Sequence, residues 1–202
     1  MFVVIGLPFL VMAVTFMFIA FIGFIGKLGN QSLHPVLIRT VKKFLENVRV
    51  KPSEDMLMAG PVQGDLGSET ITVGQSMGAR GIPPKGPMFS VMKSSRVNFS
   101  FMLKEIGADG GVLLGFKSKV EPSISTRHEL MADDPDDLVF KPEQSTALRN
   151  LCQLANFQRV INIPEPNGSG FSIIFNGVGF DCGQEEQEQA VIKATREALI
   201  VF

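Results

Sequence analysis

The stretch FQRVINIPEPNGSGFSIIF, residues 157–175, decides how this chain folds. Short runs rich in Val, Ile and Phe occupy residues 157–163 and 171–175, and such runs are typical of β-strands. The Gly-rich segment 167–170 between them has the composition of a turn. The pattern therefore predicts a β-hairpin.

Two helices and three more strands are predicted around this hairpin. An apolar stripe with helical spacing predicts a helix over residues 141–156, and residues 184–202 predict a second one with an acidic first turn. Alternating or apolar runs predict three upstream strands, of which a Gly-rich turn joins the first two as a hairpin: residues 97–103, 112–120 and 123–132. The order β-β-β-α-β-β-α indicates an α+β fold, with an antiparallel sheet and two or three helices that cover one of its faces.

The N-terminal residues 1–26 contain no charged side chain and are almost entirely apolar. A run of this length, as a helix, is long enough to cross a bilayer. It lacks the basic start and short apolar centre of a cleaved signal peptide. We therefore expect a single transmembrane helix that is retained as an anchor.

A basic segment follows the expected anchor. Residues 27–51 carry six Lys or Arg against Glu46, a net charge of +5, and their apolar residues recur with helical spacing. Positive charge beside the span favours a cytoplasmic C-terminal domain, although the reverse orientation stays open. The expected location is the inner membrane of a bacterium. The expected amphipathic helix either binds anionic lipid through Arg39, Lys42 and Lys43 or packs on its own domain or a neighbouring subunit.

The remainder divides into an arm and a domain. Residues 52–89 are rich in Gly and Pro, which predicts an extended arm, although residues 56–59 and 70–73 are apolar enough to form strands. Residues 90–202 have the size of one compact domain. From residue 52 onward there are 13 Lys or Arg and 19 Asp or Glu, a net charge of −6. This acidic balance argues against a nucleic-acid partner.

No catalytic, cofactor-binding or metal-binding motif is recognisable. The acidic cluster formed by Asp133, Asp134, Asp136 and Asp137 lacks the spacing of a calcium loop and is interpreted as a solvated turn. His128 has acidic and basic neighbours but no marked nucleophile. Cys152 lies in the apolar register of a predicted helix, and whether it pairs with Cys182 is left open. We expect no enzyme activity, no catalytic residue and no cofactor.

These features together predict a non-catalytic accessory subunit of a multi-subunit membrane complex. A photosynthetic or respiratory energy-transducing complex is the expected host, with integral membrane subunits and the lipid bilayer as partners. The transmembrane helix and the arm would stabilise neighbouring subunits, because a partner offsets the entropy lost when an arm becomes ordered. The alternative is a stand-alone, membrane-tethered domain that binds a ligand or protein through the sheet face not covered by helices.

Overall fold

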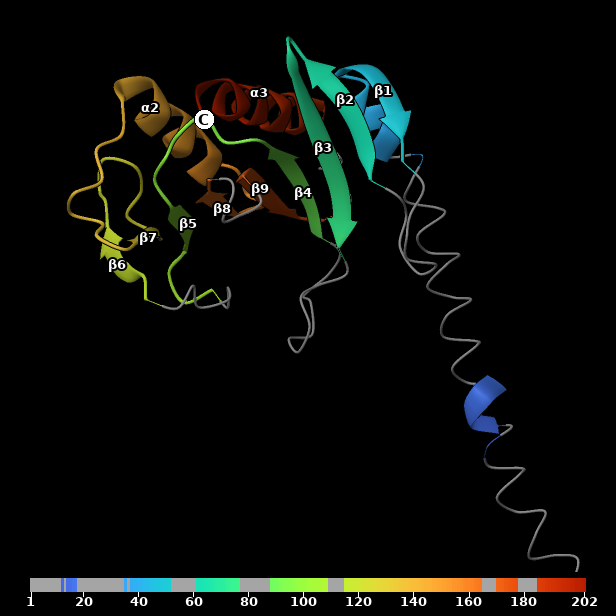
Figure 1. Ribbon diagram of the computed structural model, residues 1–202, viewed down its shortest axis with the longest axis horizontal. Helices are drawn as coiled ribbons and strands as arrows, with labels where there is room; N and C mark the ends of the chain where they lie inside the picture. Colours follow the sequence, from blue (N-terminus) through green and yellow to red (C-terminus); the bar gives the residue numbers. More distant parts are fainter. Residues whose placement is uncertain are drawn as a thin grey trace, which may run out of the picture.

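A single antiparallel sheet of nine strands forms the body of the chain in the computed structural model (Figure 1). The structure describes residues 12, 14–17, 35, 37–51, 61–76, 88–108, 115–164, 170–177 and 185–202. The strands are β1 (Glu46–Val50), β2 (Val62–Leu66), β3 (Glu69–Ser76), β4 (Met88–Lys93), β5 (Phe101–Glu105), β6 (Lys117–Val120), β7 (His128–Ala132), β8 (Phe157–Ile163) and β9 (Gly170–Asn176). Two helices have described bounds, α2 (Pro142–Cys152) and α3 (Glu185–Val201), and residues 14–17 and 37–41 are also helical.

The strands lie in the order β1-β2-β3-β4-β9-β8-β5-β7-β6, and every neighbouring pair is antiparallel. Figure 1 shows α2 and α3 side by side on the same side of this sheet. Strand residues alternate between the two faces, so every second side chain points toward these helices. The core therefore forms between the helices and one face of the sheet.

Phenylalanine rings fill the core, in keeping with a chain that has 17 Phe and no Trp or Tyr. Phe171 of β9 stacks on Phe202, with ring centroids 4.8 Å apart. Phe101 of β5 lies 5.5 Å from the same ring. Phe89 of β4 stacks on Phe175 of β9 at 4.9 Å. Each of these five side chains is fully buried, so the rings join the end of α3 to the centre of the sheet.

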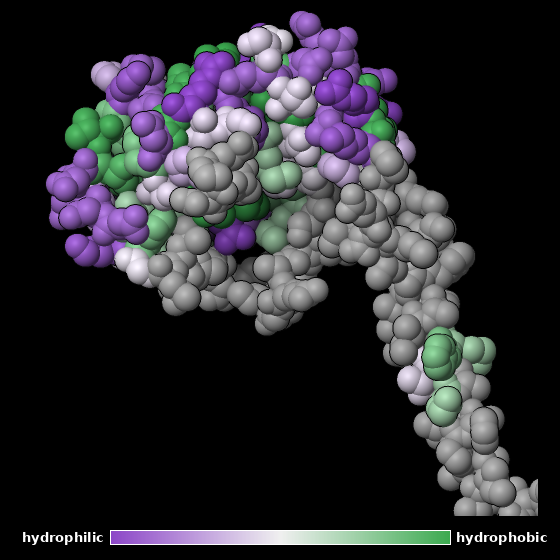
Figure 2. Space-filling model, viewed as in Figure 1, coloured by the Kyte–Doolittle hydropathy of each residue, from purple (hydrophilic) through white to green (hydrophobic). Residues whose placement is uncertain are grey.

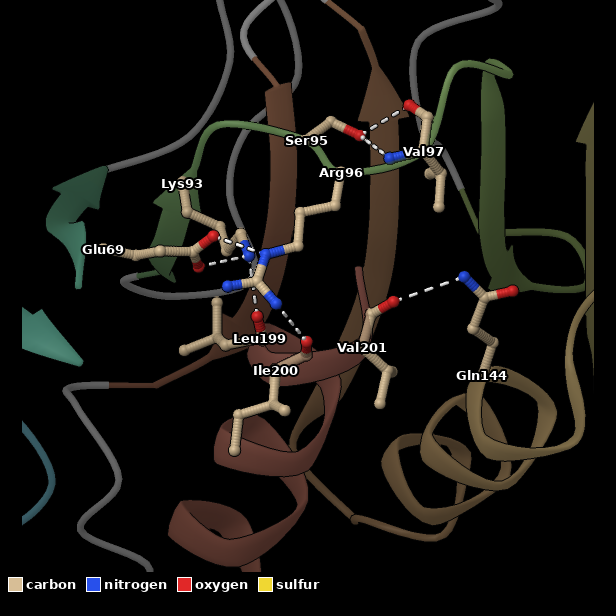
Figure 3. Close-up of polar contacts among 9 residues, drawn as sticks. All are labelled: Glu69, Lys93, Ser95, Arg96, Val97, Gln144, Leu199, Ile200 and Val201. Carbon is tan, nitrogen blue, oxygen red and sulfur yellow. Dashed lines mark hydrogen bonds and ion pairs between the residues drawn. The ribbon is translucent and has the colours of Figure 1, made fainter. Parts of the chain in front are cut away.

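The C-terminal end of α3 is fixed to the sheet by donors that meet its free carbonyl groups (Figure 3). Lys93 Nζ donates to Leu199 O at 2.8 Å, and Arg96 donates to Ile200 O at 3.1 Å. Both cations also contact the carboxylate of Glu69 at 2.5 Å. Burial raises the pKa of Glu69, but the hydrogen bonds from Lys93 and Arg96 outweigh that effect and hold it below its usual value. Cations suit this end of a helix, where the last carbonyls lack partners.

The expected fold class is corrected by the sheet. Nine strands and two helices make the described chain mostly β-sheet, in place of an α+β domain behind a transmembrane helix. Strands that the sequence analysis did not assign, β1, β2 and β4, account for much of the difference. Individual elements do lie where expected: β8 spans residues 157–163, and it pairs with β9 as the predicted hairpin requires.

The expected membrane span, residues 1–26, lies mostly outside the described residues, of which only Met12 and residues 14–17 belong to it. No helix within the described part of the chain combines the length and the apolar character needed to cross a bilayer. The single-pass membrane assignment and the location derived from it are corrected accordingly.

The basic segment is only partly helical. Residues 37–41 are helical, but residues 46–50 form β1. The apolar side chains Leu37, Val41, Phe44 and Leu45 are buried in the core of the same domain. The helical spacing of apolar residues is correct for the helical part of the segment. It also extends into β1, where it does not indicate a helix and where most residues are exposed.

Two expectations about connections also change. Within the expected arm, β2 and β3 form a hairpin around the turn at Gly67, whose φ of +63° suits glycine. Residues 56–59 lie outside the described part of the chain. The predicted hairpin between β5 and β6 is wrong, because β7 lies between these strands in the sheet. The sequence analysis paired β5 with the next strand along the chain, β6. In the structure, β5 pairs with β7.

Candidate functional site

The most chemically suggestive cluster joins His128 to Cys152 through Ser125. His128 begins β7, and its Nδ1 lies 2.8 Å from Ser125 Oγ. Cys152 ends α2, and the same serine acts to lower the pKa of its thiol, against the larger effect of burial. The imidazole and the thiol are both buried, at 6% and 5% exposure. Sequence analysis singled out both residues but gave no sign that the fold brings them together.

This cluster does not form an activated nucleophile. Burial raises the pKa of Cys152 to about 12, so the thiol keeps its proton near neutral pH, where only a thiolate would react. Burial also lowers the pKa of His128; Arg127 lowers it too, and Glu105 raises it in opposition. The neutral imidazole and the serine hydroxyl therefore form a structural hydrogen bond beside the protonated thiol.

We expect the stability of the protein to fall as the pH drops below about 6.5, in part because of His128. Its folded pKa lies below the unfolded value, so the unfolded chain binds a proton more readily. The stabilising contribution is complete above the unfolded pKa and is lost as the pH falls through the folded pKa. Urea unfolding over this pH range should show a shallower dependence for His128→Leu. Parallel curves for the two proteins would contradict a buried, neutral imidazole.

The acidic turn after β7 is used in ion pairs. Asp136 Oδ1 lies 3.1 Å from Lys119 Nζ, and Asp134 Oδ2 lies 3.9 Å from Lys117 Nζ, both on the edge strand β6. Within the described ranges, no group of three or more His, Cys, Asp or Glu side chains is arranged to hold a metal ion. Pairing with lysines accounts for these two carboxylates.

The three basic residues considered for lipid binding do not act alike. Arg39 and Lys42 are exposed. Lys43 Nζ contacts Glu188 Oε2 of α3 at 2.5 Å, which ties the segment to the domain. Binding of anionic lipid by these residues stays a prediction.

A cavity of about 480 Å³ opens where α2 ends and α3 begins. Residues 153–156, which connect α2 to β8, form one side. Asn176 at the end of β9, together with Gln187, Ala190 and Val191 of α3, completes the lining. The volume is within the range typical of ligand pockets. Elements distant in sequence thus meet around one site.

The polar lining of this cavity consists of carboxamides. Gln153, Asn156, Asn176 and Gln187 belong to it, together with four apolar residues, and none of these eight described residues is charged. Asn176 N donates to Asn156 O at 2.8 Å and so holds the end of β9 against the connection that follows α2. The side-chain oxygen Asn156 Oδ1 is buried and has no hydrogen-bond partner in the described structure. A buried acceptor without a donor costs free energy.

Comparison with known proteins adds little to this description. No protein-family model matches the chain, and no curated protein matches it. Among solved structures, the chain is similar to the crystal structure of the mycobacterial trehalose monomycolate transport factor A, TtfA, with a TM-score of 0.43 and 11% sequence identity over 80% of this chain and 79% of that chain. Since this similarity is too low to carry an argument, the function is inferred from the residues of the chain itself.

Proposed function

We propose that this chain is a non-catalytic accessory protein that binds a partner protein, and that the carboxamide-lined cavity receives an uncharged segment of that partner. The observation that carries the proposal is the cavity itself, whose lining combines four carboxamide residues with four apolar residues and no charge. The protonated Cys152 and neutral His128 support a role without catalysis.

The chemistry of the lining favours a peptide main chain. A carboxamide offers both a donor and an acceptor, as a peptide group does. A charged ligand would lose its hydration without gaining an opposite charge from Gln153, Asn156, Asn176 or Gln187. Leu154, Ala155, Ala190 and Val191 supply apolar contacts for small side chains. An uncharged stretch of polypeptide satisfies both kinds of surface.

The proposal is tested by selecting random peptides on the purified full chain and measuring the affinity of the winners by calorimetry. We expect Ala190→Trp, which fills the cavity, to weaken binding by about tenfold or more. Ala190 lies exposed at the rim, so the substitution is compatible with folding. Circular dichroism spectra of the variant should match those of the wild type.

Gln189→Trp is the matched control, because Gln189 is exposed on the same helix but does not line the cavity. It should bind the selected peptides with unchanged affinity. Peptides that bind wild type and Ala190→Trp equally would refute the site. Binding of small uncharged amides or polyols, with no peptide selected, would favour the stand-alone ligand-binding alternative. The host assembly expected from sequence stays a prediction.

A further inference from the structure

The sheet face turned away from α2 and α3 carries a row of apolar side chains. Cross-strand register places Met92, Ser172, Ile161, Met102 and Met131 side by side on β4, β9, β8, β5 and β7. Their neighbours along the strands belong to the core beneath the helices, so this row points to the opposite face. Neighbouring strands lie about 4.8 Å apart, and the row is therefore roughly 19 Å long.

The adjacent row on this face contains a cation without a countercharge. Arg159 of β8 faces Ile174 on one side and Lys104 on the other. Burial lowers the pKa of Arg159, and its buried Nε has no hydrogen-bond partner in the described parts of the chain. Glu129 is the next residue in the row, but its carboxylate lies 3.2 Å from Lys104 Nζ. The Glu129 carboxylate is therefore paired with Lys104, and no ion pair among the described residues includes Arg159.

A guanidinium stays protonated in proteins, so Arg159 cannot avoid this cost by losing its proton. A partly buried charge without a partner destabilises the fold. A bound anion would remove this penalty. Figure 2 shows hydrophobic colouring next to a hydrophilic area beneath the domain, on the side away from α3.

We propose that this face binds an anionic amphiphile, a ligand with one oxyanion head group and an apolar chain. The head group, a carboxylate or phosphate, would accept two parallel hydrogen bonds from the Arg159 fork. The chain would lie along Met92, Ile161 and Met131, which are partly exposed, whereas Met102 beside them is buried. Unbranched, polarizable methionine side chains adapt to apolar ligands of varied shape, and three of them occur in this one row. Charge and apolar surface together define the ligand, and this site is distinct from the carboxamide-lined cavity.

The test uses calorimetry on the purified full chain with four probes below their micellar concentrations: dodecanoate, dodecyl phosphate, 1-dodecanol and acetate. We expect both amphiphilic anions to bind the wild type, and Arg159→Met to weaken them about tenfold. Comparison of dodecanoate with dodecyl phosphate tells which head group fits better. Dodecanol should bind wild type as weakly as the anions bind Arg159→Met, and acetate should not bind measurably.

Arg196→Met is the matched control, since Arg196 is exposed on α3, and it should leave the affinity unchanged. Arg159→Met should fold and unfold at an equal or higher urea concentration, because it replaces an unpaired charge by an apolar side chain. Equal affinity of dodecanoate for wild type and Arg159→Met would overturn the proposal. So would acetate binding as tight as dodecanoate binding, or binding of an acidic apolar peptide with no binding of either amphiphile.

Discussion

Lys93→Met is expected to lower the free energy of unfolding by about 3 kcal/mol, measured by urea unfolding at neutral pH. The Lys93 side chain is 1% exposed, and its Nζ joins Glu69 of β3 to Leu199 O at the end of α3. Methionine fills a similar volume but donates no hydrogen bond. The substitution therefore leaves a buried carbonyl without its donor, and Glu69 keeps only Arg96 as a partner.

Lys117→Met provides the comparison for this result. Lys117 is also a strand lysine with an acidic neighbour, but its side chain is 69% exposed and lies 3.9 Å from Asp134. Exposed ion pairs of this kind contribute little, so the change in unfolding free energy should stay within about 0.5 kcal/mol. Similar losses for the two variants would show that burial of the Lys93 ion pair does not hold α3 on the sheet.

The periodicity of apolar residues predicted several individual strands and helices but not the full extent of the sheet. The strand at residues 157–163 and the helix ending at residue 201 follow clear apolar patterns. In the segment taken for an arm, β2 contains Gly64, which resembles a loop residue in sequence. A Cβ atom there would lie 2.7 Å from Leu45 Cβ, so the glycine permits close packing of the preceding segment. The same residue type signals a loop or a tight contact, and sequence alone does not distinguish them.

Neither candidate site has a linear motif. The four carboxamides of the cavity are spread from residue 153 to residue 187, and the turn between α2 and β8 brings them near α3. Arg159 looks in sequence like an ordinary polar residue of a strand. Its lack of a countercharge becomes visible only when register places it opposite Lys104. Local sequence patterns predict which residues are buried. Which residues lie opposite each other on neighbouring strands depends on the order of the strands in the sheet, and local patterns do not contain that order.

Gly170→Ala is expected to destabilise the protein by at least about 3 kcal/mol, by urea unfolding followed by circular dichroism. Gly170 begins β9 with a φ of +81°, a conformation that costs alanine roughly 1–2 kcal/mol. In addition, a Cβ atom at this position would lie within the contact distance of Lys93 O at the end of β4. The Cβ atom is fixed rigidly to the backbone of residue 170, and Lys93 O belongs to the backbone of β4. The clash is therefore relieved only if β4 and β9 separate, which strains their pairing.

Gly67→Ala separates the two causes. Gly67 has a similar φ of +63° in the turn between β2 and β3, but a Cβ atom there would meet no other atom within 4 Å. It should therefore cost only the conformational part, about 1 kcal/mol. Equal losses at both positions would show that backbone conformation alone matters. Because the Gly170 clash displaces the residue that fixes α3, Gly170→Ala combined with Lys93→Met should cost less than the two single losses added together.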